Sequence, residues 1–314
     1  MSRVMKRMLT LAAVLLLACS HAAAETIDAG DGIRLWYKSA GNRKGSPIIV
    51  IHGGPGMDYN SLAADLKPLE KTHRLIYYDQ RGGGRSSLPS DPALLTIDHH
   101  VRDLEALRQS LHLDKVVLLA HSFGPAIAAL YAIRYPDHVE RMIFLSPIPP
   151  RKGKFFEEFG ATMQQRLTAE QRKRSEEARK RYDGPDVVAA CREYWSINTP
   201  PRLSKSLPAS VVKSDLCTAS PEAIRYGAAK TNPATFSSLG DWDWTADLAH
   251  VKVPTLIIHG EEDAIPMAMV SQWETAMPNA QLMKLPNTGH FPHAERPSIV
   301  FPAIEKFLRE PVTR

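Results

Sequence analysis

The sequence has only three cysteines among its 314 residues, little net charge, and an N-terminal apolar run that is too short to cross a bilayer. That run spans residues 9–18, follows three basic residues and precedes three alanines at 22–24. The pattern is typical of a secretory signal peptide with a small-residue cleavage site. We therefore expect residues 1–24 to be removed and the mature protein to be exported, into a periplasm or out of the cell.

A second interpretation of the N-terminus stays open. Residues 16–19 resemble a bacterial lipobox, in which Cys19 becomes the lipidated first residue of the mature protein. The protein would then be a membrane-anchored lipoprotein, and a membrane is an expected partner only in that case. Mass spectrometry of the mature N-terminus distinguishes the two interpretations.

The weak excess of positive charge argues against a nucleic acid as a partner. The net charge is +5, and it falls to +2 once the three basic residues of the N-terminal segment are removed. The densest basic stretch, residues 166–181, also carries Glu170, Glu176 and Glu177. Interspersed charges of both signs are typical of a solvated helix surface and not of a nucleic-acid site.

Cysteine is too scarce to predict more than one disulfide. With Cys19 excluded, only Cys191 and Cys217 remain, 26 positions apart. Two cysteines in an exported chain are candidates for a disulfide, although two buried free thiols would look the same in sequence. Titration of free thiols in the unfolded, unreduced protein distinguishes these alternatives.

The sequence also lacks a phosphate-binding loop. Three consecutive glycines at 82–84 follow the predicted strand 75–78, but neither the Lys-Ser/Thr nor the G-x-G-x-x-G pattern accompanies them. We expect Asp79, Arg81 and Arg85 in this stretch to brace loops around a site.

The most informative segment that is present runs from Val116 to Tyr135. A wholly apolar, β-branched run stops at Ala120-His121-Ser122-Phe123-Gly124 and resumes with helical spacing. This predicts a strand, a sharp turn and a helix, with Ser122 at the tip of the turn. Small residues two positions before and after Ser122 let the strand and helix pass closely. A serine that only caps the helix is the alternative reading.

A second glycine-rich turn supplies candidate oxyanion-hole donors. The buried strand predicted at 48–51 ends at His52-Gly53-Gly54-Pro55-Gly56. Such a turn can point backbone amides at a ligand. In an acyl-transfer enzyme one donor comes from this loop and the other from the residue after the nucleophile, which assigns Gly54 and Phe123.

The remaining elements complete an alternating pattern of strands and helices. We expect an opening hairpin over 26–38, a helix over 98–111 capped by Asp98, strands at 142–145 and 282–285, and a buried strand at 255–259. Asp263 lies just after the strand at 255–259, and His290 follows the last strand. In the chain order serine, acid, histidine these are the candidate acid and base of a triad, with Glu261, Glu262 and His293 as weaker competitors.

Taken together, the segments 52–56, 79–86 and 103–108 and the Ser122 turn resemble the proline iminopeptidase branch of the α/β-hydrolase superfamily. The resemblance implies a mostly parallel sheet with helices on both faces and an inserted helical cap. We expect core at 25–147 and 246–314, and cap at 148–245. It also implies a Ser122, His290 and Asp263 triad that works without metal or organic cofactor.

The cap region decides the substrate. Proline iminopeptidases typically hold the substrate's free amino group with acidic cap residues, one of them in a Trp-Ser-x-Trp-Glu stretch. Here that stretch is Trp195-Ser196-Ile197-Asn198-Thr199, so Thr199 stands in place of the glutamate. We expect Trp195 to contact substrate and Glu193, or else Glu222, to supply the missing carboxylate, since a buried ammonium without a partner costs several kcal/mol.

Candidates for lining the cleft are the aromatic residues of this region, which otherwise pack cap against core: Tyr194, Trp195, Phe236, Trp242 and Trp244.

Three functions follow. The first is an exported serine aminopeptidase of the proline iminopeptidase type, which would act on short peptides. The second is a carboxylesterase acting on small esters, and the third is a binding protein on an inactive hydrolase scaffold. The filled triad positions disfavour the third, and the sequence does not reveal the oligomeric state.

Overall fold

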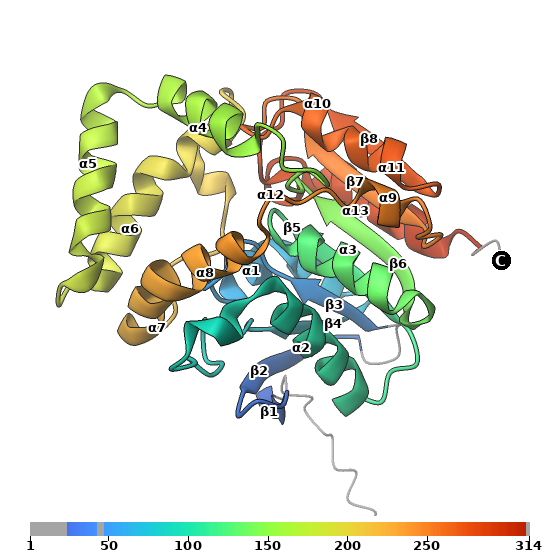
Figure 1. Ribbon diagram of the computed structural model, residues 1–314. Helices are drawn as coiled ribbons and strands as arrows, with labels where there is room; N and C mark the ends of the chain where they lie inside the picture. Colours follow the sequence, from blue (N-terminus) through green and yellow to red (C-terminus); the bar gives the residue numbers. More distant parts are fainter. Residues whose placement is uncertain (1–23, 43–46, 312–314) are drawn as a thin grey trace, which may run out of the picture.

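The computed structural model describes residues 24–42 and 47–311, and they are built around an eight-stranded sheet (Figure 1). The strand order is β1-β2-β4-β3-β5-β6-β7-β8. The first three strands pair in antiparallel fashion, and the strands from β4 to β8 are parallel. The strands are β1 (Ala24–Asp28), β2 (Arg34–Gly41), β3 (Pro47–Ile51), β4 (Arg74–Tyr78), β5 (Val116–His121), β6 (Val139–Leu145), β7 (Thr255–Gly260) and β8 (Ala280–Leu285).

The central strands are apolar along their whole length because helices cover both faces of the sheet. One face packs against α1 (Asn60–Glu70) and α13 (Pro297–Arg309), whose apolar side chains share a cluster with alternate residues of β3, β4 and β5. The opposite face packs against α2 (Ile97–Ser110) and α3 (Gly124–Arg134). Two covered faces and a parallel centre place the carboxyl ends of β5, β7 and β8 along one edge.

The opening hairpin, the six strands that follow it and the sharp turn at Ser122 confirm the sequence predictions. One local prediction is wrong. The cap of α2 is Thr96, whose side chain accepts a hydrogen bond from the His99 amide, whereas Asp98 lies in the first turn of the helix. Asp98 instead pairs with Arg102 and Arg134 on the surface.

The segment between β6 and β7 contains no strand and carries the helices that stand apart from the sheet in Figure 1. Its helices are α4 (Phe155–Arg166), α5 (Ala169–Lys180), α6 (Val187–Asn198), α7 (Pro221–Tyr226), a π-helical turn (Gly227–Thr231), α8 (Asn232–Ser238) and α9 (Thr245–Leu248). The remaining helices are α10 (Met267–Val270), α11 (Gln272–Ala276) and α12 (Pro292–Glu295), and the 3-10 turns are Pro92–Leu95, Pro136–His138, Arg181–Asp183, Pro200–Arg202 and Ala209–Val211.

Part of the segment between β6 and β7 has a small apolar core of its own. Cys191 of α6 and Cys217 form a disulfide with Cα atoms 5.9 Å apart, which lies in an apolar cluster with Tyr182, Val187 and Ile224. A separate apolar cluster and a covalent link both fix α6 against the loop before α7.

Removal of this disulfide is expected to destabilise the protein by about 3 kcal/mol. The link joins residues 26 positions apart and thereby lowers the conformational entropy of the unfolded chain. The measurement is the thermal midpoint of a Cys191→Ala, Cys217→Ala variant of the mature protein. Reduced wild-type protein is the control and should match the variant. An unchanged midpoint would contradict the expectation.

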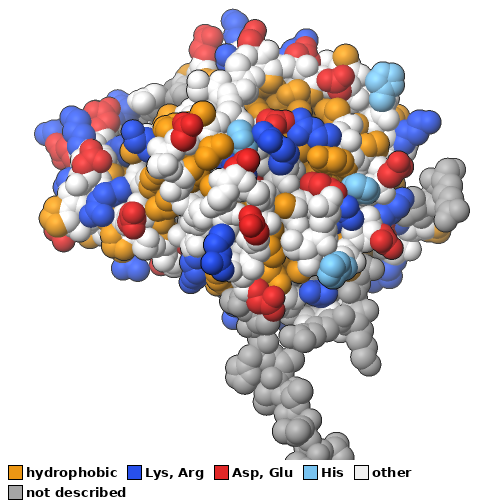
Figure 2. All heavy atoms as spheres, turned by 60° about the horizontal axis from the view of Figure 1, so that its bottom comes forward, with side chains coloured by type: hydrophobic (Ala, Val, Ile, Leu, Met, Phe, Trp, Pro, Cys, Tyr) orange, Lys and Arg blue, Asp and Glu red, His pale blue; other side chains and the backbone are white. Residues whose placement is uncertain are grey.

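The surface carries charges of both signs. On the face shown in Figure 2, basic and acidic side chains are interspersed, without a large area of either sign. In the part of the chain that the structure describes, no helix combines the length and apolar character needed to span a bilayer. Residues 1–23 of the expected signal peptide, Cys19 among them, lie outside the described residues.

Candidate active site

Ser122 lies at the tip of a strained turn between β5 and α3. Its φ angle is +59°, in the left-handed region that a serine adopts at a cost. The strain is imposed by close packing: a Cβ on Gly124 would come within 2.5 Å of the Ile51 carbonyl, and one on Gly53 within 2.7 Å of the Ser122 Cβ. The turn holds the Ser122 hydroxyl away from the sheet and into a cavity.

Three polar side chains from separate loops form a continuous hydrogen-bonded row. The Ser122 Oγ lies 3.0 Å from His290 Nε2, and His290 Nδ1 lies 2.9 and 3.1 Å from the two carboxylate oxygens of Asp263. Asp263 follows β7 and His290 follows β8. The row has the geometry in which a histidine accepts the serine proton while a carboxylate holds the opposite nitrogen as a donor.

The Asp263 carboxylate is buried yet stays ionised. Burial alone would raise its pKa, but the nearby His290 and His259 rings and the hydrogen bonds from His290 and the Ile265 amide hold that pKa well below its ordinary value. Glu262, another candidate for the acid, does not bind His290. Its carboxylate instead accepts a hydrogen bond from the Lys205 amide. The geometry therefore selects Asp263 as the partner of His290.

The histidine loop is held by contacts on both sides. The His290 amide donates to the Arg202 carbonyl at 2.7 Å. On the other side the His121 ring packs 4.9 Å from the His290 ring, and its Nε2 donates a hydrogen bond to the His290 carbonyl at 2.9 Å. His293 is fully buried 5.2 Å from the His121 ring and bonds to no polar atom of the described residues, so it is not in the row.

Two backbone amides border the cavity next to Ser122. The Gly54 and Phe123 amides donate to no acceptor among the described residues, and both residues line the cavity. Gly54 has a φ of +57°. These are the positions that the sequence assigned to an oxyanion hole.

The glycine-rich loop after β4 packs against the loop that follows β3 and contains Gly54. Both oxygens of Asp79 accept backbone hydrogen bonds, from the Tyr59 and Arg85 amides at 2.8 Å. Arg81 is fully buried and forms two hydrogen bonds to Asp103. Burial raises the pKa of Asp79 to about 7, although the two backbone hydrogen bonds act to lower it. Burial also raises the pKa of Asp103 to about 6, although its pairing with Arg81 acts to lower it. The structural role predicted for this loop is confirmed.

A cavity of about 390 Å³ opens above Ser122, between the sheet edge and the helices that precede β7. Its walls are largely aromatic. Tyr194, Trp195 and Phe236 line it as expected, and sequence reasoning missed three phenylalanines of α4: Phe155, Phe156 and Phe159. The size and apolar lining fit a small organic substrate.

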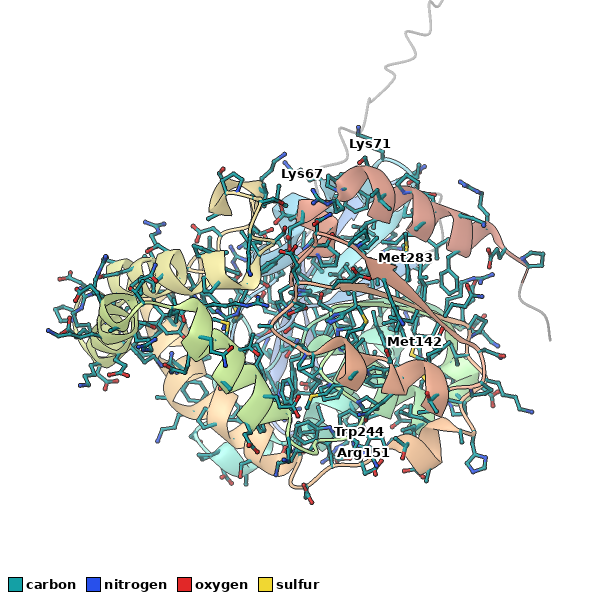
Figure 3. The ribbon with its side chains drawn as sticks, turned by 90° about the horizontal axis from the view of Figure 1, so that it is seen from above. Lys67, Lys71, Met142, Arg151, Trp244 and Met283 are labelled. Atoms are coloured by element: carbon teal, nitrogen blue, oxygen red, sulfur yellow. A yellow bond between two sulfur atoms is a disulfide. The ribbon has the colours of Figure 1, made fainter. Side chains whose placement is uncertain are left out.

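Trp242 and Trp244 do not line the cleft, and for them the alternative interpretation, packing of the cap region against the core, is confirmed. Both are buried against the main core, and the Trp244 ring lies 6.3 Å from Trp273 of α11. The Trp244 amide donates to Pro150, which places it beside Arg151 at the start of the insertion (Figure 3). These tryptophans join insertion to core.

Glu193 does not lie in the cavity. It faces away on α6, where its carboxylate pairs with Arg174 and Arg181. This pairing follows from its position on the helix face that packs against α5 and the 3-10 turn after it, which carry Arg174 and Arg181. Glu222 is also exposed and does not line the cavity. Neither Glu193 nor Glu222 therefore supplies the carboxylate that is missing at position 199, where Thr199 stands in place of a glutamate.

The charged lining residues are ones that the sequence did not single out. Asp58 is the only carboxylate among them, and it already accepts hydrogen bonds from the Asn60 amide and the Thr218 hydroxyl. Arg179 and Arg202 also line the cavity. No sequence signal separates these arginines from the others, because only the packing of α5 and α6 directs them inward.

Comparisons with known proteins place the chain in a family. Residues 46–297 match the model of the α/β-hydrolase fold, so the chain belongs to that family and is an enzyme of the hydrolase class. More particularly, it is similar to proline iminopeptidases. It is 28% identical to that of Heyndrickxia coagulans, over 90% of this chain and 97% of the relative, and 29% identical to that of Saccharolobus solfataricus, over 88% and 89%.

Solved structures share the same architecture. A proline iminopeptidase of Mycobacterium smegmatis superimposes with a TM-score of 0.66 and 24% identity, over 91% of this chain and 97% of the other. A thermophilic esterase from Thermogutta terrifontis superimposes with a TM-score of 0.67 and 25% identity, over 92% and 98%. The fold is thus shared by a peptidase and an esterase, and the fold alone does not choose between them.

Proposed function

We propose that this chain is an exported serine hydrolase that forms an acyl-enzyme on Ser122 and acts as an aminopeptidase of the proline iminopeptidase type. The observation that carries the chemistry is the row of Ser122, His290 and Asp263, with consecutive distances of 3.0 and 2.9 Å. The peptidase assignment rests on full-length similarity to proline iminopeptidases.

In the first half of the reaction Ser122 Oγ attacks the substrate carbonyl carbon while His290 Nε2 takes the hydroxyl proton. The Gly54 and Phe123 amides donate to the oxyanion of the tetrahedral intermediate. His290 then gives its proton to the departing amine or alcohol, which leaves the acyl group on Ser122. In the second half His290 deprotonates a water that attacks the ester, and the acid leaves as Ser122 regains its proton.

The ionised Asp263 has a positional and an electrostatic role in both halves. It keeps the proton of the neutral imidazole on Nδ1, so that Nε2 is the nitrogen free to accept. It also stabilises the imidazolium that forms during each proton transfer. Because the Asp263 pKa lies well below its ordinary value, the carboxylate is available for this role at neutral pH.

A carboxylesterase is the second candidate, and the cavity lining favours it. An aminopeptidase must hold the ammonium group of its substrate, but Thr199 is buried where a glutamate is expected, and Glu193 is paired outside the cavity. Asp58 is the one lining carboxylate available for an ammonium. An ester without an amino group needs no such partner.

The test is kcat/KM of the mature protein on prolyl-arylamide, alanyl-arylamide and a short-chain p-nitrophenyl ester. We expect arylamide turnover with a preference for proline. Ester turnover without arylamide turnover would replace the aminopeptidase with the carboxylesterase, and the absence of all three activities would contradict the hydrolase proposal. Ser122→Ala protein measures the background.

A further inference from the structure

The cavity above Ser122 contains a positive charge that the reaction chemistry does not use. Arg202 ends the 3-10 turn after α6, and its guanidinium lies 5.4 Å from the Trp195 ring and 5.7 Å from the Phe159 ring. It is half-buried and lines the cavity. Its main-chain carbonyl accepts a hydrogen bond from the His290 amide, so the backbone of Arg202 lies next to the histidine loop.

Arg202 has spare hydrogen-bonding capacity. A guanidinium carries five N–H groups, and among the described residues Arg202 donates only to the Asn198 carbonyl and forms no ion pair. Arg81 shows the contrast: it is fully buried, and it binds both oxygens of Asp103 and the Leu94 carbonyl. Burial lowers the Arg202 pKa, although nearby Tyr194 and the Asp263 carboxylate act in the opposite direction, and this reflects the cost of enclosing a guanidinium that forms no ion pair within the described part of the chain.

A second guanidinium lies farther along the same wall. Arg179 of α5 is exposed at the cavity, lies 4.7 Å from the Tyr182 ring and 5.9 Å from the Tyr194 ring, and donates to the Ala228 carbonyl. The Tyr194 and Trp195 rings meet edge to face at 5.3 Å. The two arginines therefore flank one aromatic pair, Arg202 on the Trp195 side and Arg179 on the Tyr194 side.

The charge balance of the lining favours an anionic ligand. Two guanidiniums stand against one carboxylate, Asp58, which is already bonded to Asn60 and Thr218. A planar guanidinium with free N–H groups matches a carboxylate in shape and charge. The Trp195 and Phe159 rings lie within cation–π distance of the guanidinium, and such contacts do not use its N–H groups.

We propose that Arg202, assisted by Arg179 near the cavity opening, binds a carboxylate carried by the substrate and so makes the enzyme selective for acidic substrates. The proposal rests on the proposed hydrolase function. The carboxylate has two possible sources: the C-terminus of a dipeptide, which leaves with the amine, or a second carboxyl group on the acyl part of an ester. Arg202 is a specificity residue in either case and takes no part in bond breaking.

Matched substrate pairs test the proposal by kcat/KM. Prolyl-alanine against prolyl-alaninamide places the charge on the leaving group, and succinyl against butyryl p-nitrophenyl ester places it on the acyl group. We expect the charged member of one pair to be preferred by wild-type protein. The Arg202→Gln substitution should lower the ratio of kcat/KM for the charged member to kcat/KM for the neutral member by about 20-fold, because a charge-assisted hydrogen bond is lost. The change should fall mainly on kcat/KM for the charged member.

The control variant is Arg225→Gln. Arg225 is a cap arginine that also donates to one backbone carbonyl, that of Gly184, but it does not line the cavity. Its replacement should leave both preferences unchanged. Arg179→Gln should reduce the preference less than Arg202→Gln, because Arg179 is more exposed.

Binding separates failure of this proposal from failure of the proposed function. Calorimetry on Ser122→Ala protein compares monomethyl succinate with uncharged dimethyl succinate and requires no turnover. Tighter binding of the charged ligand that Arg202→Gln abolishes supports the site even if every activity assay is negative. Turnover of neutral substrates with no preference for charge, together with equal binding of both ligands, would overturn it.

Discussion

Replacement of Ser122 with alanine is expected to lower kcat by about 10⁶, the scale of loss for a nucleophile that acts as one unit with its histidine. In the proposed mechanism the Ser122 hydroxyl forms the covalent bond, and no other hydroxyl is bonded to His290 Nε2 among the described residues. The cavity, the two free amides and the disulfide do not depend on this oxygen, so folding and substrate binding should persist. The measurement is kcat on the best substrate, with the thermal midpoint as a check on folding.

Ser146 provides a matched control for that experiment. It follows β6 as Ser122 follows β5, and it also has a positive φ, of +46°. Its hydroxyl is buried without a hydrogen-bond partner in the part of the chain described, so Ser146→Ala removes a serine from the neighbouring turn without affecting the row. We expect kcat within about twofold of wild type, because no reacting group is touched. A loss of less than tenfold for Ser122→Ala would contradict its assignment as nucleophile.

The sequence predicts the sheet and the row because both depend on local patterns. Buried parallel strands are short apolar runs, and the turns after them carry residues whose backbone conformation or polarity is unusual. Ser122, Asp263 and His290 each follow such a run, and parallel strands bring their carboxyl ends to one edge. Their convergence therefore follows from chain order and strand direction, without knowledge of any long-range contact.

The cavity wall is different, because it depends on how helices outside the sheet rotate and pack. Glu193 and Trp195 are two residues apart on α6, so they point to different sides of the helix, and only one of them can face the cavity. Trp195 faces the cavity, and Glu193 pairs with Arg174 of α5 and Arg181 of the next 3-10 turn. Arg202 gives no sequence signal because its role depends on lacking a partner, which is visible only when every neighbour is known.

The same distinction explains why the sequence alone could not decide whether Trp242 and Trp244 line the cleft or pack the insertion against the core. Aromatic residues near a cleft and aromatic residues that join an insertion to the core have the same composition and similar spacing. Trp242 and Trp244 stack at 5.9 Å and lie in the core cluster with Trp273, which comes after β7 in the chain. A contact between segments separated by a strand is not encoded in the local pattern around either tryptophan.

Replacement of Asp263 with asparagine is expected to lower kcat by about 10⁴ while it changes the shape of the site little, as for the acid of other serine triads. Asp263 Oδ1 accepts from both the Ile265 amide at 3.0 Å and His290 Nδ1 at 3.1 Å, and Oδ2 accepts from His290 at 2.9 Å. An amide offers one oxygen. If that oxygen stays on the Ile265 amide, the NH₂ group faces His290 Nδ1 and makes that nitrogen an acceptor.

The imidazole proton then moves to Nε2, where it points at Ser122, and the ring can no longer take the serine proton. The loss should therefore fall on kcat, with KM within a fewfold of wild type, because the cavity lining does not include Asp263. Glu262→Gln is the control: its carboxylate binds the Lys205 amide and not His290, so kcat should change less than about threefold. The reverse pattern, in which the Glu262 variant is inactive and the Asp263 variant is active, would show that the neighbouring carboxylate orients the histidine during the reaction.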